Sequence, residues 1–403
     1  MDNRIIAVFT GNRAEYGLQY PILKAINEHP QLDYRLIVSG AHLDDSFGRT
    51  IEEIRNDGFE ISAEVKIDMA DDTLTSTAQA IGSGVISMSQ ALEQIKPHYL
   101  AVYADRFEGF AAVIAGTQMN VPTAHIEGGD ITEGGALDDS VRHAMSKLAH
   151  LHFTTNQQAS NRLLAMGEEK WRVHTVGFPA IDLIALGKFA RPEEISAKLK
   201  LDLNRPVVIF TQHSVTTQFD QAEAQLLPSL EAIRKLANDG VQIILTYPNN
   251  DAGGRKIIDG LKKFAADRIE NTRVARSLGR HLYHGLLALA RHPSIRVACV
   301  GNSSSGIKET PAFGCPAVNI GSRQKGRLRG VNVIDVDYHS QAIYDAVRRC
   351  LLDPSFRQDC RSGENPYGVG DAGKKIADCL ASQPYDLPKL LTKLWVWNKL
   401  ESI

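Results

Sequence analysis

Short apolar runs rich in β-branched residues alternate with amphipathic helical patterns along almost the whole chain, and this alternation constrains the fold most. Examples are RIIAVFT (4–10), YRLIVSG (34–40) and HYLAVYA (98–104), with helix-like stretches such as YPILKAINEH (20–29) between them. The runs are apolar without strict polar alternation, which is typical of parallel strands covered on both faces. Strands and helices alternating at this spacing predict right-handed βαβ units and doubly wound α/β sheets.

A second series of strand-like runs follows a polar, partly helical stretch at 187–206 that suits a linker. It includes VVIFTQH (207–213), VQIILTYPNND (241–251) and IRVACVGNSSS (295–305). A chain of 403 residues also exceeds what one hydrophobic core usually organises. We therefore predict two similar α/β domains whose sheets face a central cleft.

The expected first domain covers residues 1–185 and is completed by C-terminal helices in 372–403, and the second covers residues 186–371. Two C-terminal segments, GDAGKKIADCLAS (370–382) and LPKLLTKLWVWNKL (387–400), are expected to be closing helices.

Composition excludes several classes of protein. A formal net charge of −2 gives no reason to expect nucleic acid as a partner, so any bound anion needs a local site. The five cysteines include no CxxC pair, which indicates reduced thiols rather than a disulfide framework or a zinc site. The N-terminal apolar run is too short for a signal peptide, and no segment approaches a membrane span. We expect a cytoplasmic protein.

Three acidic side chains follow strand-like runs, at the sheet edge where ligands bind in such folds. Asp105 lies in YADRFEG, Glu127 in HIEGG, and Asp138 begins a helix in LDDSVRH, with Arg142 four residues further on. One such acid is usually a helix cap with an i,i+4 partner. Three acids at one edge favour acid/base chemistry. HIEGG is not HExxH, so its histidine lacks the spacing of a zinc ligand.

A serine loop, GNSSSGIKE (301–309), follows a strand and opens a helix. Its glycines free the backbone, and Ser303 and Ser304 offer hydroxyls beside unpaired helix N–H groups, which suits a diphosphate. A plain serine N-cap is the alternative. Glu309 could reach a ribose hydroxyl or be a solvated helix residue.

Three basic side chains are further candidates for anion binding. Arg13 in TGNRAEYG begins a helix and could pair with a phosphate in a bidentate manner, or be an ordinary surface arginine. Arg323 begins the basic loop of SRQKGRLRG, which could also be a solvated charge run. His213 in TQHSVTT could become charged and stabilise a leaving diphosphate, or be a satisfied, partly buried histidine.

In this order, the motifs resemble those of the hydrolysing UDP-N-acetylglucosamine 2-epimerases. These include the bacterial enzymes of sialic acid synthesis and the epimerase half of the animal bifunctional epimerase/kinase. The resemblance covers essentially the whole chain. It rests on TGNRAEYG, DRFE, HIEGGD with DDSVRHAMSKLAHLHF, QHSVTT, YPNNDAGG, GNSSSGIKE and NIGSRQKGR. It implies a glycosyltransferase-B-like fold of two Rossmann-like domains, a cytoplasmic homo-oligomer (dimer or tetramer), and no cofactor or metal. The implied reaction converts UDP-GlcNAc and water into UDP and free N-acetylmannosamine (ManNAc).

The resemblance also implies roles for single residues. Asp105, Glu127 and Asp138 become the catalytic carboxylates, with His213 acting on the leaving diphosphate. Nucleotide and phosphate binding falls to Arg13, Asn249, Leu278, Ser303, Ser304, Glu309 and Arg323. We expect anti elimination of UDP through a 2-acetamidoglucal, followed by addition of water and protonation of C-2 from the other face. Which acid removes the C-2 proton stays open.

Two departures from the family pattern leave the sugar open. ADR stands at 104–106 where many relatives have GDR, and the loop between Glu127 and Asp138 is longer than in the animal enzyme. One alternative substrate is a UDP- or GDP-linked 2,4-diacetamido-trideoxyglucose of legionaminic-type acid synthesis. A non-hydrolysing epimerase is a second alternative, although IEGGD and QHSVTT replace its EAGLR and HRREN motifs. A glycosyltransferase or a non-catalytic sugar-nucleotide sensor of this fold are more distant ones.

Overall fold

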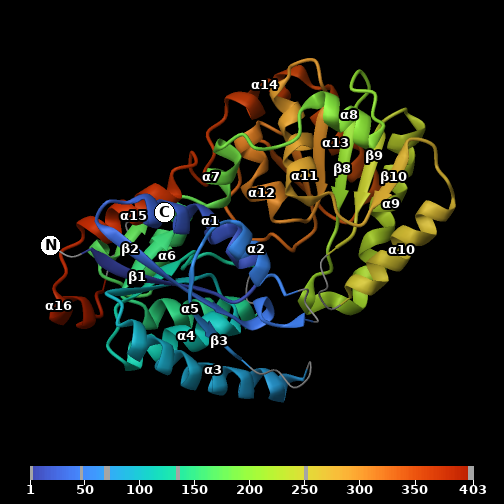
Figure 1. Ribbon diagram of the computed structural model, residues 1–403. Coiled ribbons are helices and arrows are strands. Elements are labelled where there is room, and N and C mark those ends of the chain that lie inside the picture. Colours follow the sequence, from blue (N-terminus) through green and yellow to red (C-terminus); the bar gives the residue numbers. More distant parts are fainter. Residues whose placement is uncertain (1–2, 46–48, 68–72, 133–136, 249–252, 398–403) are drawn as a thin grey trace. The chain divides into compact units, whose positions relative to one another are not determined.

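The computed structural model describes residues 3–45, 49–67, 73–132, 137–248 and 253–397. The chain packs into two units, each built on its own parallel sheet (Figure 1). The first unit comprises Met1–Ile131, Leu137–Leu183 and Tyr367–Ile403, and the second comprises Thr132–Ala136 and Ile184–Pro366. The predicted pair of parallel-sheet α/β domains is therefore confirmed. That they face a common cleft stays a prediction.

The sheet of the first unit has seven parallel strands in the order β3-β2-β1-β4-β5-β6-β7. From β1 to β3 successive strands are added on one side of β1, and from β4 to β7 they are added on its other side. The strand order thus reverses between β1 and β4, and the carboxyl ends of these two strands are the expected ligand-binding edge. The strands are β1 (Arg4–Thr10), β2 (Leu32–Ser39), β3 (Ile61–Val65), β4 (Tyr99–Tyr103), β5 (Thr123–Ile126), β6 (Leu151–Thr154) and β7 (Val173–Thr175).

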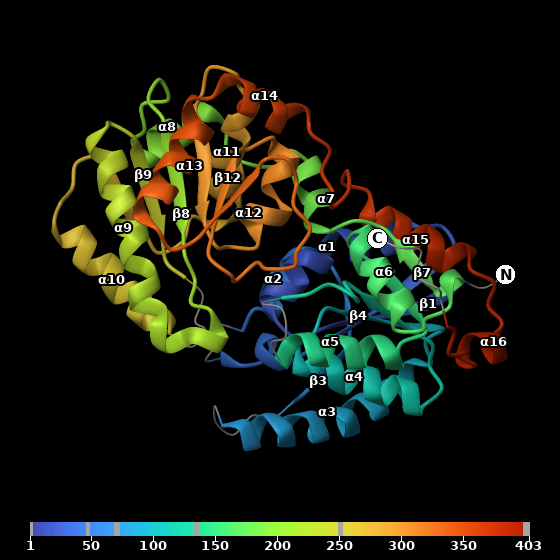
Figure 2. The same cartoon turned by 180° about the vertical axis from the view of Figure 1, so that it is seen from behind.

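Helices cover both faces of this sheet (Figure 2). Neighbouring strand residues alternate between two cores: Val8 packs with α1 and α15, whereas Phe9 packs with α3 and α4. This double burial explains why the strands are apolar on both faces. The helices are α1 (Arg13–Glu28), α2 (Ile51–Asn56), α3 (Leu74–Ile95), α4 (Phe107–Gln118), α5 (Leu137–Leu148), α6 (Gln157–Ala165), α15 (Ala372–Ser382) and α16 (Leu387–Leu391), and α7 (Ala180–Ala185) lies at the unit boundary.

The second unit repeats this topology with six parallel strands in the order β10-β9-β8-β11-β12-β13. The order reverses between β8 and β11, so the loops after these two strands are its counterpart of the β1/β4 edge. The strands are β8 (Val207–Thr211), β9 (Gln242–Thr246), β10 (Thr272–Ala275), β11 (Val297–Gly301), β12 (Ala317–Ile320) and β13 (Val333–Val336).

The main core of the second unit joins one face of this sheet to α9, α10, α13 and α14. On the opposite face α11 and α12 contact β11, and α8 packs on α11. The helices are α8 (Pro192–Leu199), α9 (Ala222–Asn238), α10 (Gly254–Ala266), α11 (Gly279–Ala288), α12 (Ser305–Lys308), α13 (Ser340–Leu352) and α14 (Pro354–Ser362).

The prediction of a closing helix over 387–400 is wrong in part. Only Leu387–Leu391 are helical, and residues 392–397 are not. The buried Arg172 guanidinium donates to the carbonyl oxygens of Lys389, Leu390 and Thr392 at 3.2, 2.9 and 2.7 Å. These carbonyls would be acceptors in a continuing helix, so the tertiary contact replaces the helical bonds.

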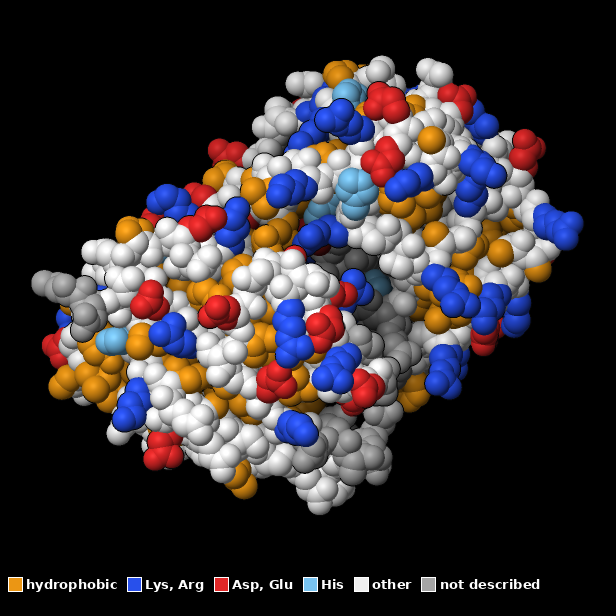
Figure 3. Space-filling model, viewed as in Figure 1, with side chains coloured by type: hydrophobic (Ala, Val, Ile, Leu, Met, Phe, Trp, Pro, Cys, Tyr) orange, Lys and Arg blue, Asp and Glu red, His pale blue; other side chains and the backbone are white. Residues whose placement is uncertain are grey.

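Charged side chains of both signs are interspersed over the face shown in Figure 3, with apolar atoms scattered between them. This distribution agrees with the formal net charge of −2. Within the described ranges, no helix combines the length and the hydropathy needed to cross a membrane.

Candidate active site

Asp105 and Glu127 leave the first sheet on neighbouring strands. Register pairs Tyr103, the last residue of β4, with Ile126, the last residue of β5. Asp105 follows two residues after Tyr103, and Glu127 directly follows Ile126. The parallel pairing thus brings both acids to the carboxyl edge of the sheet, as the sequence predicted.

A buried arginine holds Asp105. Arg142 of α5 donates from Nη2 to Asp105 Oδ2, and its Nη1 donates to Asp139 Oδ1 at 3.3 Å. The Arg142 and Asp105 side chains are only 4% and 15% exposed. A guanidinium placed between two carboxylates fixes both of them and offsets their charge. Asp105 is therefore oriented from α5 as well as from its own strand.

Asp138 lies differently from its neighbour Asp139. Asp138 is an exposed residue in the first turn of α5, whereas Asp139 is buried and forms the i,i+3 pair with Arg142. Arg142 thus has an i,i+3 partner one residue beyond Asp138, and the alternative that Asp138 caps the helix stays a prediction. Sequence reasoning did not choose Asp139, because the phase of α5 decides which of two adjacent acids faces inward.

Glu127 is held by a tyrosine. It is buried, its φ is +66°, and its backbone N–H donates to the carbonyl oxygen of Phe153 at 2.8 Å. The Tyr103 hydroxyl donates to Glu127 Oε2. Burial and the adjacent carboxylate raise the pKa of Tyr103 well above its usual value, so the hydroxyl keeps its proton and remains a donor.

The loop after β1 places Arg13 at the surface and buries Glu15. Arg13 begins α1 and donates from Nε to Glu53 Oε2 at 2.9 Å, and its side chain is 71% exposed. Glu15 accepts from the Gly11 N–H at 2.9 Å, and burial together with Glu108 raises its pKa to about 8. Glu15 and Glu108 are both in quoted motifs, TGNRAEYG and DRFE, but sequence reasoning gave neither a role.

In the second unit, a reciprocal pair of hydrogen bonds joins the ends of β8 and β11. Asn302 Oδ1 accepts from the His213 N–H at 2.6 Å, and Asn302 Nδ2 donates to the His213 carbonyl oxygen at 2.8 Å. Gly301, the last residue of β11, has a φ of +130°, and a Cβ there would lie 1.9 Å from the carbonyl oxygen of Thr211, the last residue of β8. A glycine is therefore required at this end of β11, where its backbone lies against Thr211 of β8.

His213 is mostly buried, and its pKa is lowered to about 3 by this burial and by Arg323. The ring is therefore neutral near pH 7, and that it becomes charged beside a leaving diphosphate stays a prediction.

Asn302 organises the loops around it, although sequence reasoning did not single it out. Its carbonyl oxygen accepts from Arg323 Nη1 at 3.3 Å and from Gln324 Nε2 at 2.9 Å. The predicted Arg323 is thus brought to the serine loop. The only signal for Asn302 in the sequence is its place in GNSSSG.

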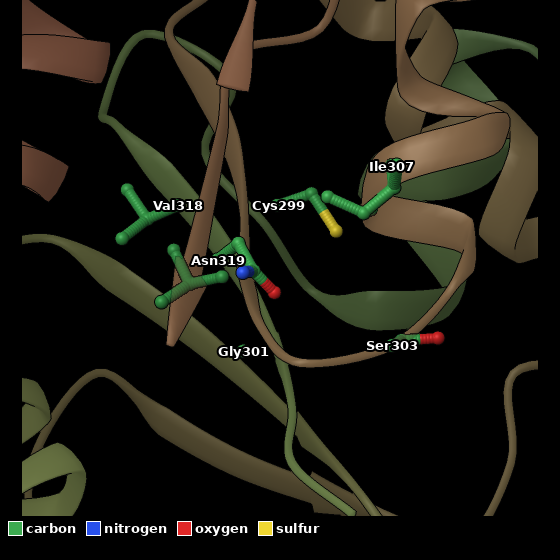
Figure 4. A pocket seen from close by; sticks show the side chains of 8 residues that line it. Cys299, Gly301, Ser303, Ile307, Val318 and Asn319 are labelled. Atoms are coloured by element: carbon green, nitrogen blue, oxygen red, sulfur yellow. The ribbon is translucent and has the colours of Figure 1, made fainter. Parts of the chain in front are cut away.

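The serine loop is half-buried and is supported from below. Ser304 is the N-cap residue of the four-residue helix α12, without a capping hydrogen bond from its side chain. The hydroxyl oxygen of Tyr283 in α11 lies 2.7 Å from Ser305 Oγ and 3.6 Å from Cys299 Sγ. Figure 4 shows the adjoining pocket, which is lined by Cys299 of β11, Ile307 of α12, Asn319 of β12 and Ser303 of the serine loop. The Ser303 and Ser304 hydroxyls thus lie on a well-supported turn.

Three more residues of the second unit are predicted to bind the nucleotide: Leu278, Asn249 and Glu309. Glu309 pairs through Oε2 with His284 Nε2 at 2.8 Å, so this histidine holds the side chain in place. Leu278 is the half-buried N-cap residue of α11. Asn249 lies outside the described residues. Among the described side chains, no group of three or more His, Cys, Asp or Glu residues is arranged as a metal site.

The chain is similar in sequence to one family of known proteins. A family model described as UDP-N-acetylglucosamine 2-epimerase matches residues 24–381. The chain is 32% identical to UDP-N,N'-diacetylbacillosamine 2-epimerase (hydrolyzing) of Legionella pneumophila, covering 94% of this chain and 96% of the relative. It is 33% identical to a UDP-N-acetylglucosamine 2-epimerase of Neisseria meningitidis serogroup B, covering 88% and 89%.

Among solved structures, the UDP-GlcNAc 2-epimerase of Neisseria meningitidis bound to UDP-GlcNAc is similar, with a TM-score of 0.76. The match covers 94% of this chain and 99% of that chain at 19% sequence identity. This likeness shows the shared glycosyltransferase-B-like fold of two parallel-sheet domains.

Proposed function

The chain belongs to the UDP-N-acetylglucosamine 2-epimerase family, and from that premise we propose that it is a hydrolysing 2-epimerase. It would convert UDP-GlcNAc, or a close 2-acetamido sugar nucleotide, and water into UDP and free ManNAc or its analogue. The name of the Legionella relative supports hydrolysis. So do IEGGD and QHSVTT, which stand where non-hydrolysing enzymes usually carry other motifs.

One observation carries the proposal: two carboxylates on neighbouring strand ends have different partners. Asp105 is held by the cation of Arg142, and Glu127 by the neutral hydroxyl of Tyr103. Two acids in different surroundings can act in two different proton steps, as an elimination followed by an addition requires.

In the proposed reaction, a base removes the weakly acidic hydrogen from C-2 while the C-1–O bond breaks and UDP leaves. The resulting 2-acetamidoglucal then takes up water: its oxygen bonds to C-1, and a proton reaches C-2 from the opposite face. Asp105 and Glu127 would handle the proton and water steps. Asp138 would support or share one of them from the first turn of α5. Correct positioning of such groups contributes typically 10²–10⁴-fold to the rate.

The second unit would hold the nucleotide. The backbone and hydroxyls of Ser303 and Ser304, together with Arg323, would bind the diphosphate. His213 would donate a hydrogen bond to the leaving group as its negative charge develops. Glu309, held by His284, would accept hydrogen bonds from the ribose hydroxyls. Leu278 and Asn249 would lie near the base and sugar, and Arg13 would reach the phosphates from the first unit.

A diacetamido sugar nucleotide is the second candidate substrate. The Legionella relative, named for such a substrate, is similar over 94% of this chain. For either substrate, the free sugar would enter the synthesis of a sialic-type acid. We also propose a cytoplasmic homo-oligomer, as the family resemblance implies.

Proton NMR in deuterated water tests the reaction. Purified protein would be incubated with UDP-GlcNAc. Free ManNAc carrying deuterium at C-2, together with UDP, is the expected product. Formation of UDP-ManNAc would contradict hydrolysis. Turnover of UDP-diacetylbacillosamine but not of UDP-GlcNAc would assign the second candidate substrate.

A further inference from the structure

His125, in the middle of β5, is fully buried and contacts two fixed partners. Its Nε2 lies 2.6 Å from the carbonyl oxygen of Ala104, and its Nδ1 lies 3.0 Å from Ser146 Oγ of α5. Gly128 closes the space beside the ring, since a Cβ there would lie 2.9 Å from both Nδ1 and Ser146 Oγ. The imidazole therefore has little freedom to turn.

These partners define which ring nitrogen carries the hydrogen. A carbonyl oxygen can only accept, so Nε2 is the N–H donor to Ala104. In a neutral ring Nδ1 then accepts from the Ser146 hydroxyl. Burial lowers the pKa of His125 to about 3, so the ring is neutral near pH 7 and this arrangement does not change there.

Ala104 is held in an unfavourable backbone conformation. Its φ is +56°, in the left-handed region that glycine occupies readily and alanine does not. Both of its backbone polar groups are tied to β5: the N–H donates to the Ile126 carbonyl oxygen at 2.9 Å, and the carbonyl accepts from His125. Since Ala104 directly precedes Asp105, its dihedral angles decide where the Asp105 carboxylate points.

We propose that His125 is a positioning residue for Asp105, because its hydrogen bond to the Ala104 carbonyl keeps Ala104 in the left-handed conformation that directs Asp105 toward Arg142. The role in turnover rests on the proposed function. The link between His125 and Ala104 does not, because it is a property of the fold. A glycine at 104 would adopt this conformation without the help of the histidine.

Two substitutions of His125 separate this role from packing. In His125→Gln the side-chain amide nitrogen can take the place of Nε2 and still donate to Ala104. In His125→Asn the shorter amide can reach Ser146 but not Ala104. Each is made alone and with Ala104→Gly. Turnover, KM and the affinity for UDP are measured, together with thermal melting.

We expect H125N to lower kcat by roughly 10–100-fold while KM and UDP affinity stay close to those of the parent. H125Q should keep most of the activity, and adding A104G to H125N should restore most of it. Equal losses in H125Q and H125N, or no recovery with A104G, would overturn the proposal.

His150, directly before β6, supplies a matched control that contacts the same strand. It is also buried, and its Nδ1 accepts from the Thr123 N–H at 3.0 Å, at the opposite end of β5. His150→Gln should lower the melting temperature without changing kcat, and A104G should not recover it.

The melting data decide the structural link even if no sugar nucleotide is turned over. We expect H125N to cost less melting temperature in the A104G background than in the parent, because the glycine needs no restraint. Strictly additive shifts would refute the link between His125 and Ala104. Coupled shifts without any turnover would leave the link standing and count against the proposed function alone.

Discussion

Arg142 on α5 donates to Asp105 after β4, so two residues 37 positions apart in the sequence form a largely buried ion pair at the edge of the first sheet. The same guanidinium also contacts Asp139. The Asp105 carboxylate, which is proposed for proton transfer, is thus held by a side chain of helix α5 and not by a neighbouring strand.

Replacing Asp105 with asparagine should lower turnover by roughly 10²–10⁴-fold, because the side chain keeps its shape but can no longer accept a proton. UDP affinity should be retained, since the residues proposed to bind the nucleotide lie mostly in the second unit. Turnover is followed by release of free sugar, and UDP affinity by titration calorimetry. Asp139→Asn is the control and should cost much less activity. Parent-like turnover in D105N would remove Asp105 from the mechanism.

Replacing Arg142 with methionine should destabilise the protein by about 3–5 kcal/mol. The change leaves two carboxylates in a largely buried place without their cation. Chemical denaturation measures the loss. Asp139→Asn combined with R142M should recover part of it, because one of the two stranded charges is gone. A neutral effect of R142M would show that water reaches this pair more freely than its low exposure implies.

The long apolar runs predicted the central strands well, including β1, β4 and β8, because burial on both faces leaves a strong signal in the sequence. Sequence reasoning did not place β3, β6, β7 or β10, and β6 is buried but only four residues long. The other three, β3, β7 and β10, are short and partly exposed, so their composition resembles that of loops. The C-terminal segment after Leu391 was misread because Arg172, far away in the sequence, takes the carbonyl oxygens that a helix would use.

For the candidate site, strand ends were predictable and partners were not. Asp105 and Glu127 lie together because parallel strands end at one edge. Which side of α5 faces inward depends on how the helix packs on the sheet. This packing decides that Asp139 is buried while Asp138 is exposed. Tyr103 and Asn302 have polar groups that matter only once neighbouring strands bring Glu127 and His213 beside them.

Glu15 predicts a specific pH dependence. Burial and Glu108 raise its pKa from about 4.5 to about 8 in the folded protein. A raised pKa contributes stability that is full below the unfolded pKa and is lost as pH rises through the folded one, so the loss should fall between about pH 4.5 and 8. Glu15→Gln, which mimics the protonated acid, should flatten this part of the curve of unfolding free energy.

Glu28→Gln, in the same helix but at an exposed position, is the control for Glu15 and should leave the curve unchanged. A decline of the same size in E15Q and in the parent would assign the pH dependence to other groups.

Activity should survive chelation. The proposed scheme stabilises the departing UDP with fixed donors, namely the serine loop, Arg323 and His213, so a divalent ion is not needed for the charge that develops. The test is turnover after dialysis against EDTA, with and without added magnesium or manganese. Loss of activity that either ion restores would contradict the scheme.

Gly301 should be among the least replaceable residues of the second unit. A Cβ at this position would lie 1.9 Å from the Thr211 carbonyl oxygen, and the φ of +130° is strained for any other residue. Gly301→Ala must therefore push β11 away from β8, at a cost of roughly 3 kcal/mol or more. That movement would separate Asn302 from His213, so UDP affinity should fall with stability.

Gly306→Ala is the matched control in the same loop, because a Cβ there meets only Cys299 Sγ at 3.8 Å. The control should keep both UDP affinity and the unfolding midpoint. If G301A bound UDP as the parent does, the close contact between the strand ends would not matter for the nucleotide site.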